Sequence, residues 1–110
     1  MIRVVFNRNE AGSIQSFSMS GHAEFDVRGK DLVCAGASAV AFGAVNSLFE
    51  NAKIEPIIDQ GKDGGYLAIE IPPVEDEMTK FRIEVILETL RTSLETIEKD
   101  YGQYIKISYN

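Results

Sequence analysis

The sequence predicts an α+β fold in which two helices pack against one mainly antiparallel sheet. Short segments with the residue pattern of β-strands occur in pairs separated by turn formers, and two longer segments have the pattern of helices. The predicted order is strand, strand, helix, strand, strand, helix, strand. The 110 residues can bury one modest hydrophobic core, so we expect a single domain spanning residues 1–110.

The first two strands are expected at residues 2–6 and 14–20. A cluster of turn-forming residues separates them, which predicts a β-hairpin. In the second strand, strict alternation would place Ile14 on the face opposite to Phe17 and Met19, with the serines of the strand on the side of Ile14. We therefore expect this strand to be only partly buried.

The first helix is expected from residue 32 or 33 to about residue 51, after a glycine-bounded loop at residues 21–30. Asp31 is a candidate N-cap, because its carboxylate can accept hydrogen bonds from the amides of the first helical turn. Residues 32–49 carry no charge, but their many alanine, glycine and serine residues make a poor membrane span. We interpret this segment as a buried helix.

A second hairpin is expected in the middle of the chain. Its third strand would contain Ile54, Ile57 and Ile58, and its fourth strand would cover residues 66–71. The two strands are joined by a turn rich in glycine.

The second helix follows from apolar residues that recur at helical spacing between Ile83 and Tyr101. Acidic residues at positions 75–77 lie where a helix N-terminus favours negative charge. Gly102 fits the C-terminal cap, and residues 104–109 alternate as a last strand.

The overall charge and the beginning of the chain restrict the function. The formal net charge of −6 disfavours direct binding of nucleic acid, which depends on clustered Lys and Arg. Met1 is followed directly by a strand pattern, without the features of a signal peptide. The single cysteine cannot form an internal disulfide, which suits a reducing compartment. We therefore expect a cytoplasmic protein without membrane attachment.

The single histidine and the single cysteine flank the glycine-bounded loop, in the strings GHA (residues 21–23) and DLVCA (residues 31–35). A cysteine in the first turn of a helix lies at the positive end of the dipole, which favours the nucleophilic thiolate. The amides of that turn can also hold an oxyanion. Histidine is suited to take the thiol proton and return it to a leaving amine. Cys34 and His22 are therefore candidates for acyl-transfer chemistry.

The residue pattern leaves other interpretations open. Cys34 is also consistent with a small buried hydrophobe, and His22 with a residue that merely closes a strand. A thiol redox sensor would need a resolving cysteine, which only a second chain could supply. A metal site would need further ligands, such as the carboxylates of Asp26 and Asp31, so we expect none.

Two further residues near this pair have more than one possible role. Asp31 fits a helix cap, a group that orients His22, or both through its two carboxylate oxygens. Ser38 lies one helical turn after Cys34 on the same face, where its hydroxyl either acts locally in the site or bonds back to the preceding turn.

The strings around His22 and Cys34, together with Gly29, Lys30, Ser38 and Asn46, closely resemble the ribosomal-processing cysteine protease family of the Prp type. The short chain, the opening strand and the long second helix extend this resemblance over essentially the whole sequence. The resemblance implies that Cys34 is the nucleophile and His22 the general base and acid, with support from Asp31 and Ser38. It also implies that no cofactor is needed. The residues expected in the substrate loop are Gly21, Ala23, Gly29 and Lys30.

The resemblance further implies a substrate and a partner. Family members remove the N-terminal extension of ribosomal large-subunit protein twenty-seven, form homodimers, and have a flexible loop corresponding to residues 22–33 that rearranges around the peptide. Gly36 and Gly43 depart mildly from a steady helix, because alanine would favour helix more strongly at both positions. The main alternative function is a ribosome-associated module that binds the peptide without cutting it.

Overall fold

The computed structural model describes residues 1–27, 31–62 and 64–110, and its elements follow the predicted order. The strands are β1 (Ile2–Arg8), β2 (Ile14–Ser20), β3 (Ile57–Asp59), β4 (Tyr66–Glu70) and β5 (Ile105–Tyr109). The helices are α1 (Leu32–Glu50) and α2 (Glu77–Tyr101). The sheet has the spatial order β3-β4-β2-β1-β5. Only the β1–β5 pair among these described strands is parallel, so the prediction of a mainly antiparallel sheet is confirmed.

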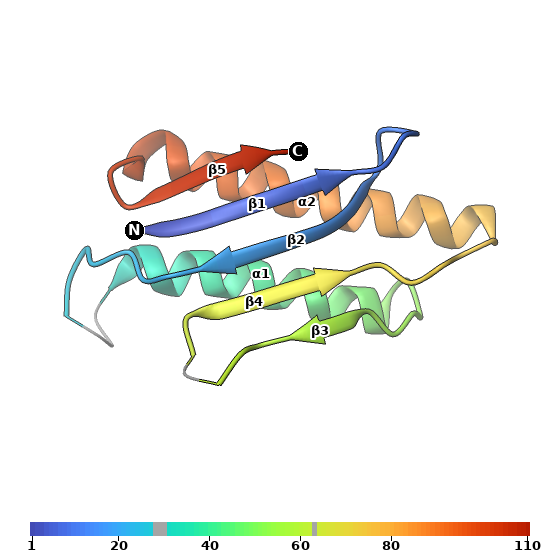
Figure 1. Cartoon of the computed structure of the whole chain (residues 1–110), viewed down its shortest axis with the longest axis horizontal. Coiled ribbons are helices and arrows are strands. Elements are labelled where there is room, and N and C mark those ends of the chain that lie inside the picture. The colour runs from blue at the N-terminus through green and yellow to red at the C-terminus, as the bar shows by residue number, and fades with distance from the viewer. Residues whose placement is uncertain (28–30, 63) are drawn as a thin grey trace.

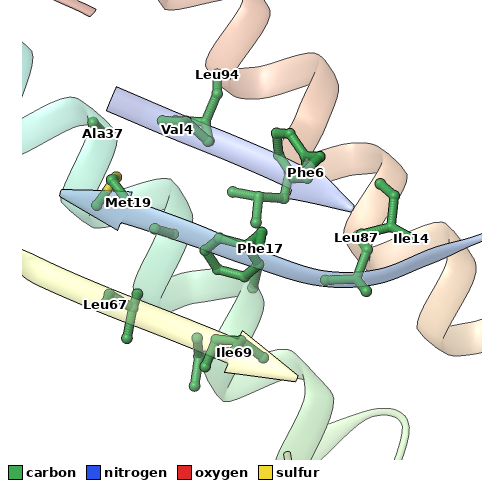
Figure 2. Close-up of a cluster of buried hydrophobic side chains, with 14 of the residues drawn as sticks. Val4, Phe6, Ile14, Phe17, Met19, Ala37, Leu67, Ile69, Leu87 and Leu94 are labelled. Carbon is green, nitrogen blue, oxygen red and sulfur yellow. The ribbon is translucent and has the colours of Figure 1, made fainter. Parts of the chain in front are cut away.

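The two helices lie on the same face of the sheet, and they also contact each other (Figure 1). The core fills the space between this face and the helices. Figure 2 shows Phe6 and Phe17 of the central strands in this layer, together with Leu87 and Leu94 of α2. All four side chains are almost completely buried. Burial of each such side chain contributes roughly 1.5–3 kcal/mol to folding.

A β-bulge in β2 makes the predicted facing of Ile14 wrong. Asn7 pairs with Ser16, but the next residue of β1, Arg8, pairs with Ile14, so Gln15 is the extra residue. The extra residue reverses the alternation at this point. Ile14 is consequently buried in the same core as Phe17.

The ends of several elements differ from the prediction. β1 continues to Arg8 instead of ending at residue 6, and β5 begins at Ile105. Ile54 is not part of β3, because its amide donates to the carbonyl of Leu48 and completes the end of α1. Gly102 is the C-cap of α2 as expected, although with right-handed helical φ and ψ.

The prediction that α1 is a buried helix is correct for only one of its faces. The buried residues are Val33, Ala37, Ala41, Ala44, Val45 and Leu48. The opposite face is exposed and remains uncharged as far as Phe49, which is 41% exposed. α1 is long and apolar enough to cross a membrane by length and composition. Its buried face, however, belongs to the core that the sheet and α2 complete.

Candidate active site

His22 is positioned by the end of β2. Gly21, the residue after β2, has a φ of +88°, and a Cβ atom there would collide with the carbonyl oxygen of Met1. Only glycine fits both conditions. The amide of Gly21 donates a 2.7 Å hydrogen bond to the carbonyl of Gly65, which continues the β2–β4 pairing beyond Ser20 and Tyr66. His22 therefore leaves the sheet at a fixed point beside the β3–β4 connection.

Asp31 is the N-cap of α1, as predicted. One carboxylate oxygen, Oδ1, accepts hydrogen bonds of 3.0 Å from the amides of both Val33 and Cys34. The other oxygen, Oδ2, accepts a 2.9 Å bond from the amide of Phe25 in the preceding loop. The same carboxylate thus fixes the beginning of the helix and the loop that leads to it.

The electrostatics of Asp31 follow from this geometry. Burial raises its pKa, but the hydrogen bonds from the amides of Cys34, Phe25, Asp26 and Val33 outweigh burial, so the pKa lies below its ordinary value. Asp31 is only 8% exposed. The group is therefore an anion held by backbone dipoles near neutral pH.

Cys34 is the third residue of α1 and is half-buried. Its Sγ atom accepts a hydrogen bond of 3.1 Å from the amide of Ala23, the residue that follows His22. Ala23 itself is buried. This contact links the histidine segment to the cysteine across the loop, and the sequence pattern gave no indication of it.

Two hollows meet at these residues. The first has a volume of about 460 Å³ and the second about 510 Å³, and His22, Cys34 and Ser38 line both. The first hollow, which we call the groove, lies between α1 and β4, and its further lining includes Met19, Phe42, Tyr66 and Leu67. The second has an acidic wall of Glu24, Asp26 and Asp31. The structure thus brings together His22, Cys34 and Ser38, with Asp31 behind the cysteine.

The amides of the first turn of α1 are already engaged. Those of Val33 and Cys34 bond to the Asp31 carboxylate, and that of Ala35 bonds to the Asp31 carbonyl. The expectation that these amides hold an oxyanion is therefore wrong for these three residues. These amides donate to the helix cap and to the helix backbone, and not to an oxyanion on the substrate.

The hydrogen bonds of the structure reduce the number of possible roles for Asp31 and Ser38. Among the described residues, the Asp31 carboxylate makes hydrogen bonds to backbone amides and none to the His22 ring. In the described part of the chain, the Ser38 hydroxyl does not bond back to the preceding turn, whereas Thr89 and Ser93 of α2 do so. Ser38 therefore keeps its hydroxyl available to the groove.

The remaining predicted residues are placed as follows. Gly21 and Ala23 flank His22 at the end of β2. Gly29 and Lys30 lie outside the described residues. Within residues 1–27, 31–62 and 64–110, no group of three or more His, Cys, Asp or Glu side chains is arranged to hold a metal ion.

The glycines of the β3–β4 connection predict only a turn, but in the structure this connection is also part of the site. Gly65 contacts the segment that carries His22. The run of glycines at residues 61, 64 and 65 is the signal that indicates a close approach of backbone at this site.

Comparisons with known proteins identify relatives over the whole chain. A family model described as the cysteine protease Prp matches residues 1–106. The ribosomal processing cysteine protease Prp of Bacillus subtilis is 43% identical over 110 residues, which cover all of this chain and 98% of that protein. Two crystal structures of the Staphylococcus aureus Prp, described as an essential ribosomal processing protease, cover 100% of both chains. The complex with a covalently linked product peptide has 35% identity and a TM-score of 0.91. The complex with a substrate peptide has 34% identity and a TM-score of 0.83.

Proposed function

The chain belongs to the family of ribosomal processing cysteine proteases, and we propose that it cuts its substrate with Cys34 as nucleophile and His22 as general base and acid. The observation that carries this assignment is the shared position of His22 and Cys34 in the groove. The described part of the chain contains no second cysteine or histidine. The nucleophile and the proton acceptor are therefore assigned without competition from other residues of these types.

The proposed reaction is acyl transfer through a covalent intermediate. The Cys34 thiol gives its proton to the His22 ring, and the sulfur attacks the carbonyl carbon of the scissile peptide bond. The carbon–nitrogen bond then breaks, and the leaving amine takes the proton from His22. A water molecule transfers a proton to His22 and attacks the thioester, which releases the new carboxyl end and the free cysteine.

Neighbouring groups support this reaction through their positions. The Ala23 amide points at the Cys34 sulfur, where it stabilises negative charge on the thiolate. Asp31 holds the beginning of α1 and so keeps Cys34 facing the groove. Ser38 presents a free hydroxyl one helical turn further along the same wall.

We propose the N-terminal extension of ribosomal large-subunit protein twenty-seven as the substrate. The relatives are named as ribosomal processing proteases, and one Staphylococcus aureus structure contains a substrate peptide. The groove, at about 460 Å³, is within the size range of ligand-binding pockets, and Met19, Phe42 and Leu67 make its wall largely apolar. We therefore expect an apolar side chain of the substrate to occupy it.

The test is cleavage of the extended ribosomal protein, followed by intact mass, with wild type, Cys34→Ala and His22→Ala. We expect wild type to remove one N-terminal segment, Cys34→Ala to remove none, and His22→Ala to be slower by a factor of roughly 10² or more. Unfolding curves of the three proteins control for misfolding. An intact substrate with folded, reduced wild type would contradict the proposal and favour a module that binds the peptide without cutting it.

We also propose that the protein is a cytoplasmic homodimer. The exposed face of α1 presents small and aromatic residues without charge, such as Ala35, Ala39 and Phe49. A face of this composition is better buried against a second copy than left in water. Sedimentation analysis should show a dimer for wild type and a monomer for Ala39→Arg. Thr92→Arg, which adds the same charge to the exposed side of α2, is the control. A monomeric wild type would contradict the dimer.

A further inference from the structure

Gly65 lies against the ring of His22. A Cβ atom built on Gly65 would be 2.7 Å from Nε2 of His22, 3.1 Å from Cε1 and 3.4 Å from Cδ2. These three atoms form the outer end of the imidazole ring, which includes one of the two nitrogens that exchange protons. The backbone of Gly65 is therefore a wall at the end of the ring, and any side chain there would displace it.

The position of this wall is set by the sheet. Tyr66 pairs with Ser20 in the β2–β4 ladder, and the Gly65 carbonyl accepts the Gly21 amide at 2.7 Å. Gly65 is thus bonded to Gly21, the residue directly before His22, and this bond continues the β2–β4 ladder. The φ of Gly65 is +66°, a backbone conformation that residues with a side chain rarely adopt.

We propose that Gly65 is a positioning residue for the protease reaction, because its backbone holds the His22 ring in the place where Nε2 exchanges a proton. This inference rests on the proposed role of His22 as general base. Gly65 acts through the histidine and does not itself react. A larger residue at position 65 would collide with the His22 ring and displace it from this place.

The chain offers a matched control in the neighbouring glycine. Gly64 has a φ of +72°, but a Cβ atom on it would meet no atom of the described residues within 4 Å beyond its own chain neighbours. Gly65→Ala and Gly64→Ala therefore add the same group to the same connection at a similar positive φ, and so with a similar backbone strain. Only the first addition meets His22. Gly12→Ala, at a φ of +87° in the β1–β2 turn, likewise meets nothing within 4 Å in the described part of the chain apart from its neighbours in sequence, and it provides a control for cleavage far from the site.

The experiment uses the single histidine and the single cysteine as probes. NMR titration of the His22 ring reports its environment, and the pH dependence of Cys34 alkylation by iodoacetamide reports the proton transfer between the two groups. We expect Gly65→Ala to alter both curves and to lower kcat for peptide cleavage at least about tenfold. Gly64→Ala should reproduce both wild-type curves, and Gly12→Ala should retain wild-type kcat.

Two outcomes would overturn the proposal. One is a Gly65→Ala protein whose titration and alkylation curves match wild type. The other is a Gly64→Ala protein that shows the same changes as Gly65→Ala. If Gly65→Ala does not fold, the wild-type protein decides: a nuclear Overhauser effect between the His22 ring and the Gly65 α-protons supports the contact, and its absence refutes it. The NMR and alkylation measurements need no peptide, so failure of wild type to cleave would count against the proposed function alone.

Discussion

Asp31 connects two segments of the site through one carboxylate. Its two oxygens bind amides of the helix α1 and of the loop before it, so the loop and the helix cannot separate without leaving buried hydrogen-bonding groups unpaired. Cys34 donates one of these bonds from its own amide. The residue that carries the nucleophile is therefore held at its backbone, while its sulfur remains in the groove.

Substitution Asp31→Asn tests this arrangement. The amide group of asparagine replaces one acceptor oxygen, so we expect a loss of about 1.5–3 kcal/mol in the free energy of unfolding at pH 7. The pKa of Asp31 lies below its ordinary value of 3.8. Its stabilising contribution is therefore complete above pH 3.8 and is lost as the pH falls through the lower pKa of the folded protein.

Urea unfolding of wild type and Asp31→Asn between pH 2 and pH 7 would measure this effect. The difference in stability between the two proteins should be largest at neutral pH and should shrink as the solution becomes acidic. A difference that stays constant over this range would show that the charge of Asp31 does not stabilise the fold.

At the scale of elements, an aromatic cluster fastens the loop after β2 to the C-terminal end of α2. The ring of Phe25 makes edge-on contacts with Tyr101 and Tyr104, at centroid distances of 5.7 Å and 5.1 Å. The same loop carries His22 and the Ala23 amide. The end of α2 therefore supports the site without lining the groove.

A double-mutant cycle with Phe25→Leu and Tyr104→Leu measures this connection. Edge-on aromatic pairs contribute about 0.5–1.5 kcal/mol beyond their burial, so we expect a coupling energy in that range from urea unfolding. The pair Phe6 and Phe17, whose centroids lie 5.9 Å apart in the core, provides a reference for an aromatic contact remote from the loop. Purely additive single effects for Phe25 and Tyr104 would show that their rings do not interact.

The sequence predicted the elements better than their details. Apolar periodicity located α2 because its pattern repeats over several turns, and Asp31 marked the beginning of α1 because a cap has a local chemical cause. The bulge at Gln15 has no such local signal, since it depends on how β2 pairs with β1. The prediction of Ile54 in the third strand was wrong for a similar reason, because its amide bonds to the end of α1.

At the scale of the whole molecule, a network of ion pairs joins the sheet to helix α2. Glu88 of α2 accepts bonds from Arg8 of β1 at 2.6 Å and from Arg91 of its own helix at 2.7 Å. The hydrogen bond from Arg8 lowers the pKa of Glu88 most, and this exceeds the opposing effect of burial. The network thus links α2 to β1, an inner strand of the sheet.

Glu88→Gln should lower the free energy of unfolding by about 1 kcal/mol at pH 7, with a smaller loss in high salt because partly exposed ion pairs are screened. The stabilising effect of Glu88 is complete above its ordinary pKa of 4.5 and disappears as the pH falls through the lower folded value. Urea unfolding checks both trends. The control is Glu84→Gln, an exposed change on α2 in a residue that forms no ion pair within the described chain. Equal effects at both positions would contradict the network.

The candidate active site could be predicted from the sequence only in part. His22 and Cys34 were identifiable because each is the single residue of its type and their flanking residues resemble one family. Their meeting in the groove depends on the turn at Gly21 and on the contact between Ala23 and Cys34. Gly65 follows His22 by 43 residues, and only the pairing of β2 with β4 brings them together.

The central place of β1 and β2 bears on when a newly made chain becomes active. Residue 34 completes the pair of reactive side chains, but β4 and β5, which cover the two edges of this hairpin, begin at Tyr66 and Ile105. These long-range pairings form late, because they require closure of long loops. We therefore expect that a chain still bound to the ribosome contains both reactive groups while its sheet is incompletely paired. Proteolysis should begin only after β5 has been synthesised.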